Sequence, residues 1–207
     1  MDGVLVQTVS SWVAVHDYFD VSNETNARRF FDGTIDEMEF IRSDVGLWQS
    51  RKGDVSVDDI RHILNAVPLM KGAKETVGAL KKMGIKTAII SGGIDILADR
   101  VREETGIDLS FANGLKSDME GRLTGEGILR VKISDKGECA RSVMSTLNIG
   151  MDECASVGDT LSDVPLFRNT RVGIAFNPTN SAVEEEADYT VRGDNLALIL
   201  NCLKEGD

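Results

Sequence analysis

Acidic, hydroxyl and basic side chains occur at separated points where the chain leaves an apolar run or enters a helical pattern. These residues are Asp2, Ser91 with Gly92, Lys136, and Asp159 with Ser162 and Asp163. Carboxylate oxygens suit Mg²⁺, which binds through few carboxylates together with a substrate phosphate. A hydroxyl and small-residue amides at the start of a helix bind anions. The residue types therefore predict a site for a phosphoryl group beside a divalent cation.

The elements that must position these residues are short apolar runs that alternate with helical patterns after about residue 86. Such alternation is typical of βαβ units and a parallel sheet. Strands are predicted at 87–90, 155–157, 172–176 and 189–191, and helices at 71–83, 94–104, 136–147, 162–168, 181–186 and 195–203. Functional groups in such sheets gather where the strands end. Ser91 and Asp159 are therefore expected at one edge of the sheet.

The first third of the chain has helical patterns only. Thr34, three residues before Glu37, predicts a capping box, and Ser56 predicts a second helix start. We expect an α/β protein with a Rossmann-like, doubly wound parallel sheet and a small helical cap domain, residues 10–67, inserted after the first strand. Residues 1–9 and 68–207 would form the core domain, and Glu120-Gly121 predicts a β-hairpin flap near 115–131.

The composition narrows the class of partner. The 207 residues carry a net charge of −11, which argues against nucleic acid and anionic membranes as partners. The three cysteines have no C-x-x-C spacing, which fits a reducing compartment and offers no zinc framework. There is neither a long apolar run nor a basic segment followed by an apolar one. The sequence thus predicts a cytoplasmic protein whose partner is a small molecule, and it carries no signal for an oligomeric state.

Each candidate residue alone also has an ordinary interpretation. Ser91 could be a helix cap, Lys136 a solvated first-turn residue, and Asp2 a turn residue beside a glycine. Asp159 and Asp163 could be ordinary capping or first-turn acids. The phosphate-site hypothesis depends on their combination. The histidines His16 and His62 are interpreted as structural or surface residues, whereas Trp12 and Trp48 could border the cleft.

Seven short segments, in their order and spacing, resemble the haloacid dehalogenase superfamily, and most closely its phosphoserine phosphatase-like branch. They are residues 2–5, 89–93, 111–113, 123–125, 135–137, 157–159 and 173–176. The resemblance covers essentially the whole chain. It implies a Mg²⁺-dependent phosphomonoester hydrolase that acts on a small phosphorylated metabolite through an aspartyl-phosphate intermediate.

The resemblance also implies a role for each candidate. Asp2 matches the second aspartate of the family motif D-x-D-G-[TV], which protonates the leaving oxygen and then activates water. The catalytic set would be Asp2, Ser91, Lys136 and Asp159; the substrate-binding set Ser91, Gly92, Lys136 and Ser162; and the Mg²⁺ set Asp2, Asp159 and Asp163.

The first aspartate of that motif, the nucleophile, would lie one residue before Met1. A central strand of about five buried apolar residues would precede it, and its loss would cost roughly 8 to 15 kcal/mol, comparable to the whole stability of a domain. We therefore expect Met1 to be an internal methionine of a longer natural chain. The 207 residues alone are expected to be inactive and to leave a gap in the sheet.

Two alternatives to a phosphatase are considered. The first is a catalytically inactive phosphate-binding or regulatory protein on the same scaffold. The second is a response-regulator receiver, which also gathers acids, a hydroxyl and a lysine on a parallel sheet. The helical insertion and the order Ser91, Lys136, Asp159 argue against a receiver.

Two positions depart from the phosphoserine-specific members of the family. Those members bind the ammonium group of the substrate with a glutamate seven residues after the second aspartate, where this chain has Val9. They bind its carboxylate with a cap arginine, and an ungapped alignment through residues 35–36 places Asp44 there, with Arg42 on another side of the helix. Serine phosphate would lose one charge partner and meet a like charge. We therefore expect a small phosphomonoester other than phosphoserine.

Overall fold

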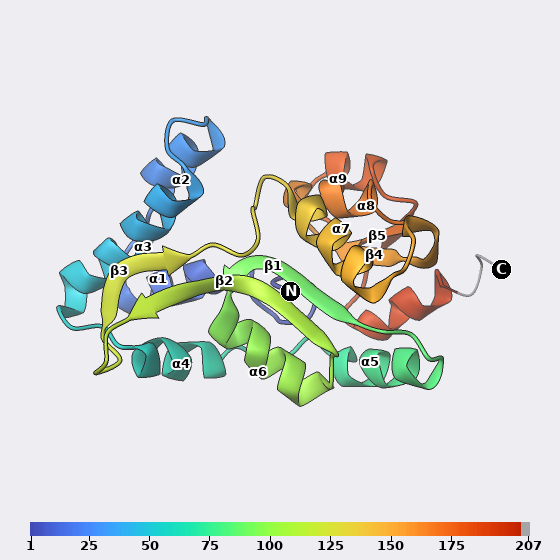
Figure 1. Ribbon diagram of the computed structural model, residues 1–207, viewed down its shortest axis with the longest axis horizontal. Coiled ribbons are helices and arrows are strands. Elements are labelled where there is room, and N and C mark those ends of the chain that lie inside the picture. Colours follow the sequence, from blue (N-terminus) through green and yellow to red (C-terminus); the bar gives the residue numbers. More distant parts are fainter. Residues whose placement is uncertain (204–207) are drawn as a thin grey trace.

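The computed structural model describes residues 1–203 and contains helices and strands in alternation after an all-helical first part (Figure 1). The α-helices and strands are α1 (Ser11–Phe19), α2 (Glu24–Phe31), α3 (Glu37–Lys52), α4 (Val57–Asn65), α5 (Ala73–Lys82), β1 (Ala88–Ile94), α6 (Asp95–Thr105), β2 (Leu109–Ser117), β3 (Leu123–Ile128), α7 (Lys136–Leu147), β4 (Ala155–Gly158), α8 (Val164–Phe167), β5 (Val172–Phe176), α9 (Ser181–Glu185) and β6 (Tyr189–Val191). Three short 3-10 helices are η1 (Met151–Glu153), η2 (Leu161–Asp163) and η3 (Leu196–Asn201).

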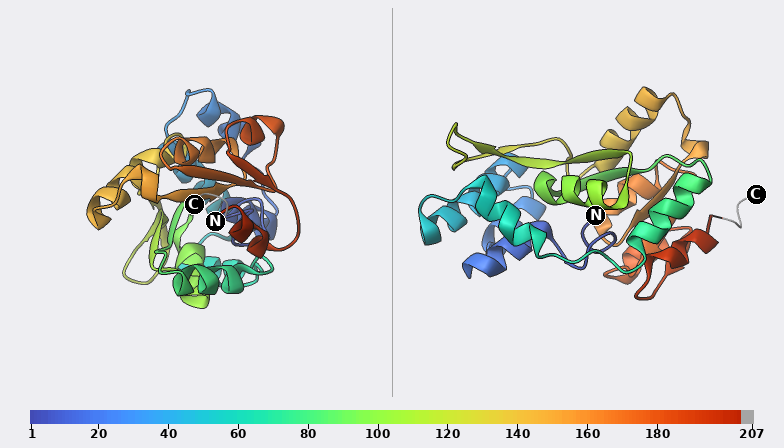
Figure 2. Two further views of the ribbon diagram at one scale, coloured as in Figure 1. Left: turned by 90° about the vertical axis from the view of Figure 1, so that its right-hand side faces the viewer. Right: turned by 90° about the horizontal axis from the view of Figure 1, so that it is seen from below.

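The strands form two sheets of three strands each. In one, β1 pairs in parallel with β2, and β2 pairs antiparallel with β3. In the other, β4, β5 and β6 are all parallel. Within residues 1–203, β1 and β4 share no hydrogen-bonded ladder, so the expected gap in the sheet is present. The chain begins near the middle of the molecule (Figure 2), where Asp2 and Val6 form an isolated bridge.

The predicted elements agree closely with the structure. The strands at 172–176 and 189–191 and the helix at 136–147 have the predicted bounds, because their apolar patterns end at clear polar or left-handed positions. The predicted capping box at Thr34 is wrong. Asp36 caps α3 instead, since its carboxylate accepts from the N–H of Glu39 at 2.7 Å and Glu39 reciprocates at 2.9 Å. The capped helix start at Ser56 is confirmed.

The predicted α/β class with parallel sheets is confirmed, and so is the β-hairpin. Strands β2 and β3 meet at a turn in which Gly121 adopts φ +80°, a conformation that favours glycine. The hairpin lies beside α1 to α4 at one end of the molecule, and β4 to β6 lie at the other (Figure 1). Gln49 of α3 donates to the carbonyl of Leu123 at 2.8 Å, which fixes the hairpin against this helix.

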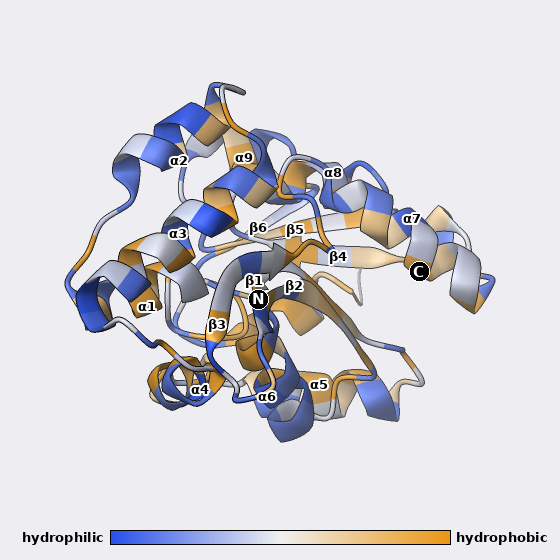
Figure 3. Ribbon diagram, turned by 60° about the vertical axis from the view of Figure 1, so that its left-hand side comes forward, coloured by the Kyte–Doolittle hydropathy of each residue, from blue (hydrophilic) through white to orange (hydrophobic). Residues whose placement is uncertain are grey.

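The hydrophobic core crosses from the helical first part into the sheet that contains β1. One cluster joins Val15, Trp48 and Leu64 of the helices to Ile94 and Leu97, all fully buried. The helices show alternating hydrophobic and hydrophilic stretches (Figure 3), as expected when one face of each packs on this core. Because one core serves both parts, the division into a cap domain and a core domain stays a prediction.

None of the helices described for residues 1–203 is both long and apolar enough to cross a membrane.

Candidate active site

A buried ion pair joins the start of α7 to the loop after β4. The Nζ of Lys136 donates to Oδ1 of Asp163 at 2.7 Å, and the two side chains are only 10% and 8% exposed. Oδ2 of Asp163 accepts from the N–H groups of Asp159 and Thr160, both at 3.1 Å, and from the Thr160 hydroxyl at 3.0 Å. Both oxygens of Asp163 are thus engaged, so this residue anchors the loop and orients Lys136. Its role as a metal ligand stays a prediction.

The two carboxylates of this loop have opposite electrostatic environments. Burial raises the pKa of Asp159 to about 6, and the neighbouring charge of Asp163 adds to the rise. Burial would also raise the pKa of Asp163, but Lys136, the Met1 amine and the N–H of Thr160 together outweigh burial, so this pKa lies below its ordinary value. Asp163 is therefore ionised at neutral pH. The ionised form of Asp159 is destabilised by its surroundings, and a bound cation would stabilise it.

The raised pKa of Asp159 predicts a fall in stability with rising pH when divalent cations are removed. The unfolded carboxyl titrates near 3.8 and the folded one near 6, so the folded chain binds the extra proton between these values. Asp159 is expected to contribute a drop in the free energy of unfolding on the order of 2 to 3 kcal/mol from pH 4 to pH 7, seen as the difference from the Asp159→Asn variant. Urea denaturation in a chelator measures it. Asp159→Asn should abolish this drop, and an equal drop in that variant would contradict the assignment.

Asp2 is held at the N-terminus of α1. Its Oδ2 accepts from the N–H and the hydroxyl of Ser11, at 2.9 and 3.0 Å. The Ser11 Oγ in turn accepts from the N–H of Ile94, at the end of β1, at 2.9 Å. The other oxygen, Oδ1, is buried and has no hydrogen-bond partner among the described residues. One carboxylate oxygen is therefore fixed, and the other is left for a ligand or a proton.

Two glycines allow the acids to approach the backbone. Gly3 adopts φ +70°, and a Cβ there would lie 2.1 Å from Oδ2 of Asp159. A Cβ on Gly93 would lie 2.7 Å from Oδ2 of Asp2. The backbone at Gly3 therefore lies against the Asp159 carboxylate, and the end of β1 lies against Asp2, although these positions span the chain. Ser91 is buried at this end of β1, and its Oγ accepts from the N–H of Gly93 at 3.0 Å.

Gly92 is held by two side chains from elsewhere. Its carbonyl accepts from Nε1 of Trp12 at 3.0 Å and from Nδ2 of Asn113 at 3.4 Å. The Oδ1 of Asn113 accepts from the N–H groups of Arg130 and Val131, both at 2.9 Å. Asn113 thereby ties the segment at Gly92 to the loop before α7.

The sequence reasoning assigned no role to Ser11 or Asn113. Asn113 lies in residues 111–113, one of the segments that resemble the family, and this resemblance could have pointed to a role for it. Ser11 follows the capping residue Ser10, which marked a helix start but not a contact with Asp2.

Ser162 lines a cavity of about 570 Å³ together with Leu161 and residues from the segment between α2 and α3. Its role in substrate binding stays a prediction.

The donor set fits Mg²⁺ with few protein ligands. No group of three or more acidic, histidine or cysteine side chains that could hold a metal occurs in the part of the chain that the structure describes. The unpartnered Oδ1 of Asp2 and the buried carboxylate of Asp159, which lies near the negative charge of Asp163, are available as hard oxygen donors. Mg²⁺ binds in this way, with water and substrate phosphate completing its shell.

The parallel strands β1 and β4 carry Ser91 and Asp159 near their carboxyl ends, the edge of the sheet where functional groups gather in α/β proteins. The chain matches the haloacid dehalogenase-like hydrolase family over residues 1–169. The phosphoserine phosphatase of Idiomarina loihiensis is 34% identical over 154 residues, which cover 74% of this chain and 69% of that protein. The phosphoserine phosphatase of Archaeoglobus fulgidus is also 34% identical, and the matched region spans 43% of its length.

Solved structures agree with these matches. A phospho-aspartyl intermediate analogue of phosphoserine phosphatase superposes with a TM-score of 0.82 at 26% identity, over 98% of this chain and 95% of that one. A substrate-bound phosphoserine phosphatase gives the same TM-score and identity, over 98% and 94%. The chain belongs to the haloacid dehalogenase-like hydrolase family, and it is phosphoserine phosphatase-like in sequence and fold.

Proposed function

We propose that the protein is a Mg²⁺-dependent hydrolase of a small phosphomonoester, and that its nucleophile is an aspartate directly before Met1. One observation carries this proposal. The α-nitrogen of Met1 is buried, and burial lowers the pKa of this amine. The charges of Asp2, Lys136, Asp159 and Asp163 all act on it. A residue attached to that nitrogen would lie among the groups that the chemistry needs.

The upstream aspartate and the site residues of this chain have separate roles in the proposed reaction. The upstream carboxylate attacks phosphorus, and the bond to the leaving oxygen breaks as Asp2 gives that oxygen a proton. Asp2 then takes a proton from water, whose oxygen attacks the aspartyl-phosphate and releases inorganic phosphate. Lys136 neutralises charge on the nucleophile and the phosphoryl group, while Ser91 and Gly92 bind phosphoryl oxygens.

Asp2 and Asp159 are the residues that would hold Mg²⁺ in this scheme. The cation would neutralise phosphoryl charge and orient the oxygen atoms around phosphorus. The unpartnered Oδ1 of Asp2 and the raised pKa of Asp159 both support a cation at this position, because each marks a carboxylate that lacks a compensating group.

The substrate is proposed to be a phosphomonoester other than phosphoserine. The relatives that match the chain are named phosphoserine phosphatases. This chain, however, has an exposed Val9 where the phosphoserine-specific members have a glutamate, and a buried Asp44 where they have an arginine. A charged amino acid would therefore find neither of the partners that the resemblance leads us to expect.

Protein isolated from its native host tests the proposal in two ways. N-terminal sequencing should find residues before Met1, and a mature chain that starts at Met1 or Asp2 would contradict the upstream nucleophile. A panel of phosphorylated metabolites should show Mg²⁺-dependent phosphate release, with phosphoserine not preferred. Phosphoserine as the best substrate by a wide margin would refute the substrate proposal. Phosphate binding without any turnover would favour a phosphate-binding or regulatory protein on the same scaffold.

A further inference from the structure

A cavity of about 550 Å³ lies between α1, α2, α3 and the end of β1. Gly92 and Asn113 form part of its wall, so it opens beside the proposed phosphoryl site. The indole of Trp12 lines it and also donates to the carbonyl of Gly92 at 3.0 Å. A molecule whose phosphoryl group is bound at Ser91 and Gly92 would place the rest of its structure in this cavity.

The charged groups in the cavity wall are all acidic. They are Asp17, Glu24, Glu37 and Asp44. No lysine or arginine lines this cavity among residues 1–203. The nearby Arg42 instead pairs with Glu126 of β3, with Nε 2.9 Å from Oε1. A carboxylate on the bound molecule would therefore meet only like charge.

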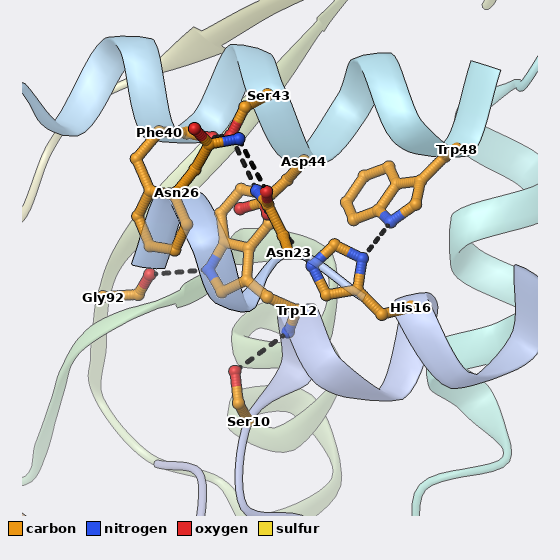
Figure 4. Close-up of polar contacts among 10 residues, drawn as sticks. All are labelled: Ser10, Trp12, His16, Asn23, Asn26, Phe40, Ser43, Asp44, Trp48 and Gly92. Carbon is orange, nitrogen blue, oxygen red and sulfur yellow. Dashed lines mark hydrogen bonds and ion pairs between the residues drawn. The ribbon is translucent and has the colours of Figure 1, made fainter. Parts of the chain in front are cut away.

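Asp44 is the most buried of these acids, at 2% exposure. Its Oδ1 accepts from Nδ2 of Asn23 at 2.6 Å and is 3.0 Å from Nε2 of His16. No described side chain donates to its other oxygen, Oδ2. Figure 4 shows Asn23 and His16 converging on this carboxylate from α1 and the start of α2. Asp44 is thus held rigidly, with one oxygen available to a ligand.

The charge of Asp44 is not neutralised by the histidine beside it. Nδ1 of His16 accepts from Nε1 of Trp48 at 2.8 Å, so this nitrogen carries no proton (Figure 4). The ring proton is then on Nε2, and the imidazole is uncharged in this geometry. A buried carboxylate with two neutral donors and no cation retains a net negative charge, which a cationic ligand would balance.

Aromatic side chains complete the surroundings of this acid. Trp12 and Phe40 line the cavity, and the Trp12 ring stacks on Trp48 with centroids 5.8 Å apart. The faces of such rings attract ammonium groups, most strongly when the groups are alkylated and weakly hydrated. The cavity therefore combines a fixed carboxylate with aromatic faces, and both of these favour an ammonium group.

We propose that the substrate is the phosphate monoester of an alcohol that carries an ammonium group and no carboxylate, with the ammonium bound by Asp44. This inference rests on the proposed phosphatase function, because the Ser91 and Gly92 segment must hold the phosphoryl end.

Calorimetric titration, in Mg²⁺, of the natural chain with asparagine in place of the upstream aspartate tests the inference without requiring turnover. The ligands are phosphoethanolamine and phosphocholine, which carry an ammonium group. Ethyl phosphate is the matched ester without an ammonium group, and phosphoglycolate is the ester that carries a carboxylate. We expect at least one ammonium ligand to bind at least tenfold more tightly than ethyl phosphate, and phosphoglycolate to bind most weakly. In Asp44→Asn the ratio between the ammonium ligand and ethyl phosphate should fall to less than about threefold.

Asp58→Asn is the matched control, because Asp58 is an exposed acid on α4 that pairs with Arg61 and lies outside the cavity lining. It should keep the wild-type ratio. Equal binding of ammonium ligands and ethyl phosphate by the wild type, or an unchanged ratio in Asp44→Asn, would overturn the inference and leave the phosphatase proposal standing. Failure of inorganic phosphate and of every ester to bind would overturn both.

Discussion

A chain extended upstream by an apolar strand that ends in aspartate directly before Met1 is expected to hydrolyse an aryl phosphate at least about 10³-fold faster than the same extension ending in asparagine. Asparagine preserves the size of the side chain but is not a nucleophile. The α-nitrogen of Met1 already interacts electrostatically with Lys136 and Asp163, so the added carboxylate would enter a site with its charge partners in place. Release of nitrophenol from nitrophenyl phosphate in Mg²⁺ measures the difference.

The two extended chains also control for folding. In both of them the added strand can pair between β1 and β4, which share no ladder within the described residues. Both should therefore melt at a higher temperature than the 207-residue chain, and by the same amount. Equal rates from the aspartate and asparagine versions, despite equal melting temperatures, would contradict an upstream nucleophile.

Replacement of Lys136 by methionine is expected to lower the free energy of unfolding at pH 7 by about 3 to 5 kcal/mol. Methionine keeps the apolar stem but removes the ammonium that lies 2.7 Å from Asp163. Asp163 would then be a buried carboxylate that has lost its ion-pair partner, close to the second buried carboxylate, Asp159. Urea denaturation in a chelator measures the loss.

Lys132→Met supplies the matched control. Lys132 pairs with Glu138 at a comparable 2.8 Å, near the start of the same helix, but both side chains are more than half exposed. Solvent screens such a pair, so its loss should change the free energy of unfolding by less than about 1 kcal/mol. Similar losses in the two variants would show that Lys136 is not the buried counter-charge of the site.

The sequence by itself determined the elements and the residue types of the site. The strand from Val172 to Phe176 and the helix from Lys136 to Leu147 were predictable because apolar periodicity and helix ends are local properties. Ser91 and Asp159 could be placed at strand ends for the same reason. Local signals failed where two of them competed: Asp36 rather than Thr34 caps α3, because only its carboxylate meets the free N–H of Glu39.

Tertiary structure decided which distant groups meet. Ser11 holds Asp2, Asn113 holds Gly92, and His16 joins Asp44 to Trp48, yet no spacing in the sequence indicates these partners. Each contact depends on how the helical first part packs against the end of β1, since that packing buries the polar groups and leaves them only each other as hydrogen-bond partners. Local pattern thus determines which groups reach the strand ends, whereas packing determines which of them keep an unbalanced charge.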